Sequence, residues 1–236
     1  MGSFGIKLEE FWKVFYQHGG YKRVITGLQN TVYIAVVGLA IGIIIGTLIA
    51  VVKVLPKYRL LPRILNKFCN FYVAMFRGTP IVVQLLVAYY VILPLIGTNL
   101  PALNVCVLVF GFNSAAYVSE IMRSGIMSVD IGQMEAGRAL GLSYGVTMMK
   151  IVVPQAIKNI LPTLGNEFIA LIKETSVVSF VGAIDLYTAF KDIGNNSYEF
   201  MVPYLVMALI YIVLVLLITL LIKVMERSLR KSDRSH

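Results

Sequence analysis

Two carboxylates stand within a predicted membrane span, residues 155–181, that is more polar than the other apolar segments of the chain. Glu167 and Glu174 are seven residues apart, close to two helical turns, so a helix puts both on one face. Ionisable groups inside a membrane are costly and rarely face lipid. Lys173 projects to a different side. Carboxylates in such a setting attract a positive group or pair with a basic side chain, so this pattern indicates binding rather than catalysis.

Residues typical of catalytic and metal sites are scarce. The chain has two histidines, His18 and His236, and two cysteines, Cys69 and Cys106, in apolar runs. No Ser/His/Asp or His/Cys cluster and no metal-ligand spacing is present, so we expect no catalytic residues and no metal. The net charge of +9 has no folded basic domain to carry it, which argues against nucleic-acid binding.

Composition places the chain in a membrane. Of its 236 residues 58% are hydrophobic, and the mean hydropathy is +0.81, whereas a soluble domain is about 45–50% apolar. We therefore predict an all-α integral membrane protein whose transmembrane domain covers residues 24–222. Because a span needs about 20 apolar residues, the charge-free runs predict five transmembrane helices. The predicted spans are 24–52, 68–93, 102–121, 155–181 and 200–222.

The flanking segments predict the orientation. Residues 1–23 form an interfacial amphipathic segment with Trp12 as an aromatic anchor, and they lack signal-peptide features, so insertion relies on the first span. Residues 53–67 hold five bases and no acid, and the tail 223–236 is also basic. The positive-inside rule places both in the cytoplasm and the N-terminus outside. Residues 185–199 read as an outer loop.

Small residues, a proline and a charge pair predict local contacts. Gly38, Gly42 and Gly46 recur every fourth residue, which makes a stripe where another helix can pack closely. Pro80 should kink the second helix, because it removes a backbone hydrogen bond, and opened backbone is tolerated where it lines a cavity. Arg77 beside it is either buried or reaches an interface. Glu120 and Arg123 can pair across one helical turn.

Residues 135–154, EAGRALGLSYGVTMMKIVVP, form the longest polar interruption between apolar spans. Helix-forming residues lead to Gly141, which can adopt the left-handed conformation that ends a helix, and Ser143 can cap the helix that follows. Ala136 and Gly137 are small, so the surface of another protein could approach closely. The segment is therefore either a docking knuckle or a juxtamembrane amphipathic helix without a docking role.

The spacing of this segment resembles the cytoplasmic motif of permease subunits of ATP-binding-cassette (ABC) importers. That motif runs Glu-Ala-Ala, three residues, Gly, nine residues, Ile-x-Leu-Pro. Here Gly137 stands for the second Ala and Val153 for the Leu. The similarity extends from about Gly27 to the fifth helix, and its motifs resemble the branch that imports histidine, arginine, glutamine and cystine. These motifs are Arg77-Gly78-Thr79-Pro80, Ala116-Tyr117 with Glu120 and Arg123, Gly132-Gln133-Met134-Glu135-Ala136, and Leu171-Ile172-Lys173-Glu174-Thr175-Ser176.

The resemblance implies a type I ABC importer permease in the bacterial cell membrane. It implies a dimer of identical or related permease subunits, two copies of a separate ATPase, an extracytoplasmic solute-binding protein and a polar amino acid substrate. This sequence has no Gly-x-x-x-x-Gly-Lys-Ser/Thr loop. We therefore expect no cofactor and no enzymatic activity in this chain, with ATP and Mg²⁺ bound by the partner ATPase.

The resemblance also implies roles for two groups of residues. A coupling helix at about 133–140, within the loop 123–154, would contact the ATPase and transmit its motion through residues 150–154 to the fourth helix. The coupling residues are Glu135, Ala136, Gly137, Arg138, Gly141 and Pro154. Glu167 and Glu174 would face the dimer interior and attract the substrate's ammonium; alternatively, Glu174 pairs with Lys173 or Arg77. The other expected pathway residues are Arg77, Thr79, Gln84, Asn113 and Ser176.

Other classes of protein explain less of the sequence. A permease for methionine or another small solute is the nearest alternative. A secondary transporter or channel could use intramembrane acids, but the chain shows no inverted repeat. A membrane-anchored signalling or scaffold protein would account for the basic loops but not for the polar fourth helix.

Overall fold

A computed structural model describes residues 3–55 and 60–231, and every regular element within them is a helix. Of the predicted basic segments, Pro56, Lys57 and Arg59 and residues 232–236 lie outside this part. The elements are α1 (Ser3–Trp12), η1 (Lys13–Gln17), α2 (Gly20–Val54), α3 (Leu60–Gly78), α4 (Ile81–Val87), η2 (Ala88–Ile92), α5 (Leu93–Leu95), α6 (Ala102–Met127), α7 (Ile131–Ala139), α8 (Tyr144–Thr147), η3 (Met148–Val152), α9 (Val153–Glu174), η4 (Thr175–Val181), α10 (Leu186–Ser197) and α11 (Met201–Lys231).

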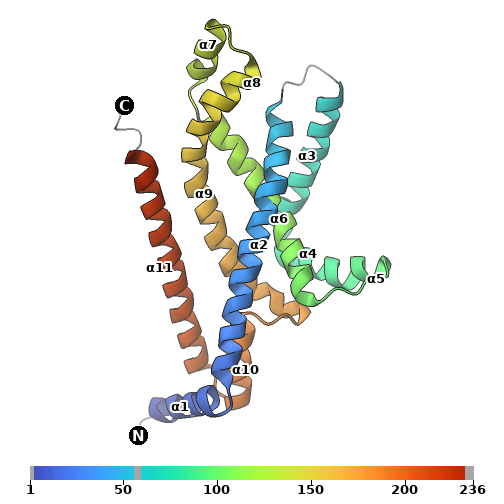
Figure 1. The fold of residues 1–236 in the computed structure, drawn as a ribbon. Helices are drawn as coiled ribbons and strands as arrows, with labels where there is room; N and C mark the ends of the chain where they lie inside the picture. Colours follow the sequence, from blue (N-terminus) through green and yellow to red (C-terminus); the bar gives the residue numbers. More distant parts are fainter. Residues whose placement is uncertain (1–2, 56–59, 232–236) are drawn as a thin grey trace.

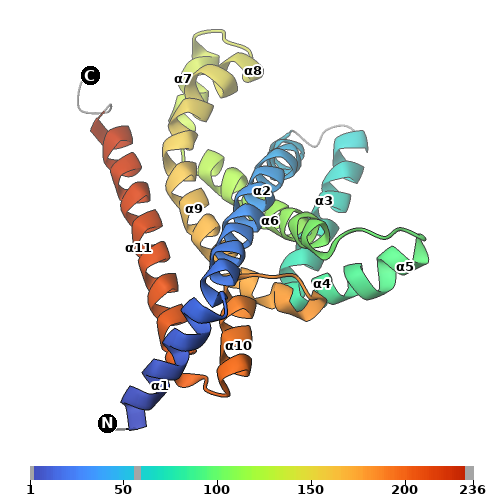
Figure 2. The same cartoon turned by 60° about the horizontal axis from the view of Figure 1, so that its bottom comes forward.

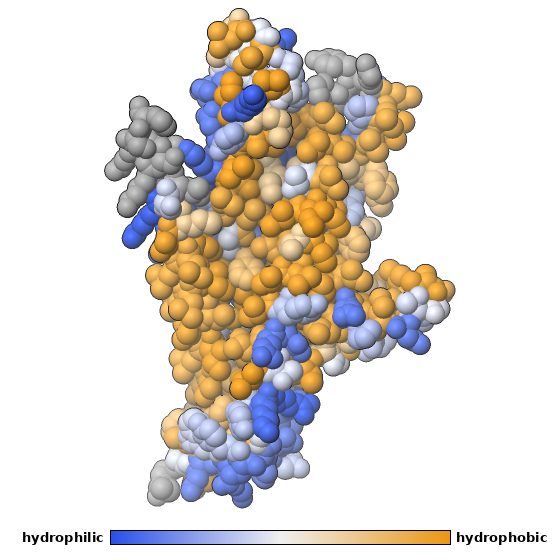
Figure 3. Space-filling view, in the orientation of Figure 1, coloured by the Kyte–Doolittle hydropathy of each residue, from blue (hydrophilic) through white to orange (hydrophobic). Residues whose placement is uncertain are grey.

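The molecule is an elongated bundle with a polar cap at one end. The helices α2, α6, α9 and α11 run along the long axis, with α7 and α8 at one end and α1 and α10 at the other (Figure 1). Apolar residues cover the visible sides of the long helices, and hydrophilic residues gather at the α1 and α10 end (Figure 3). This distribution fits a bundle surrounded by lipid along its length.

Helix length and composition identify only some of the five predicted spans. In the described residues, α2, α6 and Met201–Ser228 of α11 are long and apolar enough to cross a membrane, and the bent pair Leu60–Gly78 and Ile81–Leu95 would make a fourth span. α9 has 22 residues but is not among them, because charged residues interrupt its apolar sequence. Five spans therefore remain a prediction from the sequence, with α9 and η4 covering the predicted fourth span.

The glycine stripe of α2 packs against α6 as predicted. Gly38, Gly42 and Gly46 are buried. A Cβ atom added to Gly42 would lie 2.7 Å from Ser114 Oγ, and one added to Gly46 would lie 2.9 Å from the Ala115 carbonyl oxygen. The backbones of α2 and α6 thus approach more closely than any larger residue would allow.

The predicted kink at Pro80 is a complete break. α3 ends at Gly78 and α4 begins at Ile81, and the two directions differ by 104° (Figure 2). The single helix predicted over 68–93 is therefore two helical segments. The Gln84 side chain donates to the Phe76 carbonyl at 2.8 Å and to the Thr79 carbonyl at 3.0 Å. It satisfies backbone acceptors that the proline break leaves without helical partners.

The prediction of an outer loop at 185–199 is wrong for most of its length, because α10 is a regular helix there. Asp185 caps it by accepting from the backbone N–H groups of Tyr187 and Thr188, at 3.1 and 2.9 Å. Phe190 and Ile193 are buried against Phe11 of α1. The sequence carries these signals, a capping acid and apolar residues at helical spacing, but Gly194 and its polar neighbours obscured them.

The N-terminal segment is held against α10 and α11 by charges as well as by its aromatic residues. Lys7 Nζ lies 2.9 Å from Glu199 Oε1, and Arg23 lies 2.8 Å from Asp192 Oδ2. The hydrogen bond from Lys7 lowers the pKa of the Glu199 carboxyl below its usual value. The segment predicted as interfacial is thus docked onto the end of the bundle.

Because the α2–α6 contact leaves no room for a side chain, Gly42→Ala should lower the melting temperature of the purified protein in detergent. Overpacking of this kind costs about 1–3 kcal/mol. Gly145→Ala is the matched control, since no other atom lies within 4 Å of its added Cβ and alanine favours helix. An equal melting temperature for both variants would contradict the close packing.

Candidate functional site

A cavity of about 360 Å³ lies where the α3–α4 break meets α6 and the end of α9. Its wall brings together four of the seven predicted pathway residues, contributed by three different parts of the chain. The lining residues are Arg77, Gly78, Thr79, Pro80, Ile81, Asn113, Tyr117 and Glu174. The Pro80 break thus lines a cavity, as the sequence predicted for opened backbone at membrane depth.

A hydrogen-bonded chain of amides fixes one side of this cavity. Asn113 Nδ2 donates to Gln84 Oε1 at 2.9 Å, and Gln84 Nε2 donates to Thr79 Oγ1 at 2.9 Å. Asn113 is 4% exposed, so its amide is held by the fold rather than by solvent. Gln84 does not line the cavity itself, but it links α4 to α6 and orients two residues that do.

The cavity carries opposite charges on separate elements. The Arg77 guanidinium lies 5.3 Å from the centre of the Tyr117 ring, a cation–π distance. Glu174 reaches the wall from the end of α9. Within the described part of the chain, Glu174 forms an ion pair with neither Arg77 nor Lys173. A base, an acid and neutral polar groups therefore surround one space.

Two predicted pathway residues lie elsewhere. Glu167 is half-buried two turns from Glu174, nearer to α7, and accepts a hydrogen bond from Ser114 Oγ at 3.1 Å. Ser176 lines a separate, mainly apolar hollow of about 580 Å³ with Tyr187 and Tyr211, and its hydroxyl donates to the Lys173 carbonyl. The structure thus separates Ser176 from the polar cavity and places Glu167 between that cavity and α7.

The polar segment 135–154 folds as the end of α7, a tight turn, α8 and η3 at one end of the bundle (Figure 1). We call α7, this turn, α8 and η3 together the knuckle. α7 spans Ile131–Ala139, which agrees with the expected helix at about 133–140. Asp130 caps it by accepting from Gly132 N at 2.7 Å, a signal that the sequence analysis missed. Gly141 has φ of +77°, so it ends the helix in the left-handed conformation. Ser143 caps α8.

The predicted coupling residues divide into exposed and internal ones. Exposed are Glu135, Ala136, Arg138, Gly141 and Pro154. Gly137 is buried, and an added Cβ would lie 2.4 Å from Thr147 Cγ2, so its small size serves packing of α7 against α8. Sequence reasoning also missed two exposed apolar side chains of the knuckle, Leu140 at 80% and Met149 at 66%. Both could have been identified from the sequence as apolar residues within a polar segment.

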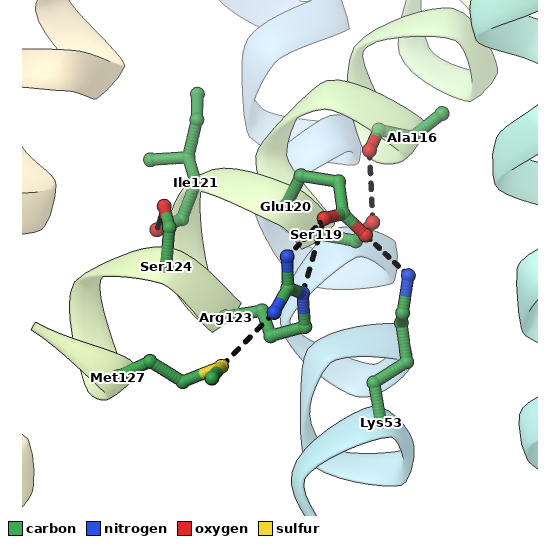
Figure 4. Close-up of polar contacts among 8 residues, drawn as sticks. All are labelled: Lys53, Ala116, Ser119, Glu120, Ile121, Arg123, Ser124 and Met127. Carbon is green, nitrogen blue, oxygen red and sulfur yellow. Dashed lines mark hydrogen bonds and ion pairs between the residues drawn. The ribbon is translucent and has the colours of Figure 1, made fainter.

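A second polar cluster lies on α6 nearer to the knuckle. The predicted pair forms, since Arg123 donates to Glu120 Oε2 from Nε at 3.0 Å and from a terminal nitrogen at 2.8 Å. Lys53 of α2 also donates to Glu120, at Oε1 (Figure 4). Among the described residues, no group of three or more His, Cys, Asp or Glu side chains could hold a metal ion.

Residues 38–231 match a family described as binding-protein-dependent transport system inner membrane component. The arginine transport system permease protein ArtQ of Bacillus subtilis is 39% identical over 210 residues, which cover 89% of this chain and 94% of that protein. A putative glutamine transport system permease protein GlnP of Rickettsia conorii is 36% identical, covering 87% of this chain and 92% of that protein.

Solved structures show the same fold. A crystal structure described as an amino acid ABC transporter with histidines superposes with a TM-score of 0.83 at 37% identity, covering 91% of this chain and 97% of that one. An inward-facing structure of the MetNI methionine ABC transporter superposes with a TM-score of 0.71, covering 87% of this chain and 95% of that one. Its 19% identity supports likeness of fold alone.

The different positions of Ala136 and Gly137 in the knuckle can be tested by a matched pair of variants. Gly137→Val should separate α7 from Thr147 and make the knuckle several-fold more sensitive to limited proteolysis, since a buried overpacked site costs about 1–3 kcal/mol. Ala136→Val, at an exposed position, should leave the cleavage rate unchanged. Equal cleavage rates for the two variants would show that Gly137 is not an internal packing position.

Proposed function

Because this chain belongs to the family of binding-protein-dependent transport system inner membrane components, we propose that it forms the translocation pathway of a polar amino acid importer and is driven by an ATPase bound at α7. The protein is a permease subunit of an amino acid ABC importer, as the identities to ArtQ and GlnP and the superposition on an amino acid transporter indicate. The proposal concerns the pathway residues, the coupling surface and the substrate class.

The observation that carries the proposal is the cavity at the α3–α4 break. An amino acid zwitterion presents an ammonium and a carboxylate, and the cavity offers Glu174 and Arg77 on separate elements, together with Thr79 and Asn113. We propose that Glu174 attracts the ammonium and Arg77 the carboxylate. Relatives named for arginine and glutamine transport favour a polar side chain over the thioether of methionine.

We propose that Glu167 acts on the same substrate after it leaves this cavity. It lies on the same helix as Glu174, about 10 Å nearer to the knuckle at 1.5 Å per residue. Its hydrogen bond from Ser114 holds it toward α6. A second carboxylate along the path would attract a cationic side chain or the ammonium as the substrate moves toward the cytoplasm.

The knuckle is the proposed contact with the ATPase. Glu135 and Arg138 offer exposed charges and Leu140 an exposed apolar side chain on or next to α7. α7 continues through Gly141, α8 and η3 directly into α9, whose last residue is Glu174. Movement of α7 on ATP hydrolysis would therefore reach the cavity along one helix, and the bundle would alternate between inward-facing and outward-facing states.

The remaining assembly follows from the family and from the charges. Importers of this family work with ATPase and solute-binding partners in general. We propose two ATPase copies, which bind ATP and Mg²⁺, a second permease subunit of the same or a related chain, and an extracytoplasmic binding protein. The basic N-terminal half of α3 and the C-terminal part of α11 lie at the α7 end (Figure 1), so we assign this end to the cytoplasm of a bacterial cell and the α1 end to the outside.

Gly141→Leu should uncouple ATP hydrolysis from transport. Leucine at φ of +77° would be strained by about 1–2 kcal/mol, although the space around the residue is open. We therefore expect the turn after α7 to change direction while the complex still assembles. We expect ATPase activity within about twofold of wild type and uptake reduced at least about tenfold in proteoliposomes. Gly145→Ala is the control, and normal uptake by Gly141→Leu would overturn the coupling role.

Glu174→Gln should lower uptake of every transported amino acid at least about tenfold, because the loss of one charge-assisted contact costs roughly 1.5–3 kcal/mol. The measurement is uptake and substrate-stimulated ATPase activity across arginine, lysine, histidine, glutamine, cystine and methionine. Glu10→Gln, at an exposed position of α1, is the matched control. Unchanged uptake with Glu174→Gln in an intact complex would return Glu174 to a structural role, and stimulation by methionine alone would replace the substrate class.

A further inference from the structure

A second polar cavity, of about 540 Å³, lies between α2, α3 and α6 and shares no lining residue with the cavity at the α3–α4 break. It is lined by Lys53, Val54, Asn66, Asn70, Glu120, Arg123 and Met127. The cavity at the α3–α4 break is lined by residues of that break, of the middle of α6 and of the end of α9. The second cavity has a different composition, with two cations, two amides and one acid at the knuckle end of the bundle.

The two cations of this cavity are held in place, but their charge is not fully neutralised and one hydrogen-bond donor of Arg123 meets only a weak acceptor. Lys53 and Arg123 both donate to Glu120, whose two oxygens are thereby occupied (Figure 4). The Lys53 and Glu120 side chains are only 11% and 20% exposed. The remaining terminal nitrogen of Arg123 donates to the Met127 sulfur, a weak acceptor. Two positive charges and one negative charge leave the cavity with a net positive charge. A ligand oxygen that accepts hydrogen bonds more strongly could replace the Met127 thioether as the acceptor for Arg123.

The α3 wall adds donors without partners. Asn66 and Asn70 line the cavity, and no hydrogen bond engages either amide within the described part of the chain. Arg63 and Lys67 are exposed on the same stripe of α3, since residues 63, 66, 67 and 70 fall within about 100° of arc. Amide donors and further positive charge therefore face the opening between α3 and α6.

The neighbouring stripe of α3 is apolar and unusually exposed. Leu60, Ile64, Phe68 and Phe71 are all more than half exposed. At 100° per residue they share an adjacent side of the helix, next to the basic and amide stripe. A ligand that fits both stripes has an anionic head and an apolar body, which a free phosphate ion lacks.

We propose that this cavity binds the headgroup of an anionic glycerophospholipid. The phosphodiester would lie between Lys53, Arg123 and the amides of Asn66 and Asn70, and the acyl chains would follow the apolar stripe of α3. Basic pockets between transmembrane helices at the cytoplasmic side recognise such headgroups in this way. The bound lipid would hold α3 against α2 and α6 close to the end where the ATPase docks.

The test compares lipid retention by the purified permease–ATPase complex extracted from vesicles of equal phosphatidylglycerol and phosphatidylethanolamine content. Native mass spectrometry counts the lipids of each kind that remain bound. We expect Asn66→Ala/Asn70→Ala to reduce retained phosphatidylglycerol about tenfold without changing phosphatidylethanolamine, since two charge-assisted contacts are lost. Asn195→Ala/Asn196→Ala is the matched control, because it removes two exposed amides from α10 at the opposite end.

Three outcomes would overturn the proposal. Equal phosphatidylglycerol retention by both double variants would exclude a headgroup site at Asn66 and Asn70. Occupancy by inorganic phosphate without preference between the two lipids would make this a site for a free anion. If the Asn66/Asn70 variant fails to assemble, Arg63→Gln replaces it, with an expected decrease of about fivefold, and undiminished retention by that variant would also overturn the site.

Discussion

The close contact between α2 and α6 positions the polar groups on which the molecule depends. With Gly42 and Gly46 against Ser114 and Ala115, the two backbones lie too close together for a side chain to fit between them. α6 then presents Asn113 and Tyr117 to the cavity at the α3–α4 break, Ser114 to Glu167 and Glu120 to Lys53. A larger residue in the stripe would therefore displace the cavity wall, Glu167 and the charge cluster together.

The cost of polar groups at membrane depth explains why these groups lie where they do. The break at Pro80 exposes carbonyl oxygens that lipid cannot satisfy, and Gln84 supplies the donors while linking α4 to Asn113. The acids of α9 face the bundle or a cavity for the same reason. The groups that satisfy the broken backbone thus lie at the same place as the cavity proposed for a polar substrate.

Sequence reasoning succeeded where the signal is local and failed where it depends on distant residues. The glycine stripe, a bend at Pro80, the left-handed turn at Gly141 and the Glu120–Arg123 pair each follow from signals within a few turns, although the bend proved to be a complete break. Lys53 pairs with Glu120 from 67 positions away, and the burial of Gly137 depends on how α8 folds back. Ser176 is an expected pathway residue two positions after Glu174, but the tighter helix η4 carries it to another surface.

The packing of α9 decides where movement can occur. Gly125 of α6 lies so close to Ile160 that an added Cβ would fall 2.3 Å from Ile160 Cγ1, so α9 packs closely on α6 at this point. A displacement that the proposed ATPase would impose on α7 would then pass through α9 to α6 and α2. Leu85 of α4 packs in the apolar core of this unit, but two cavities separate other parts of α3 and α4 from it, and cavities deform more readily than close-packed backbones. Both the proposed substrate and the proposed lipid lie at that boundary, so each can bias the same movement, one from the pathway and the other from the membrane.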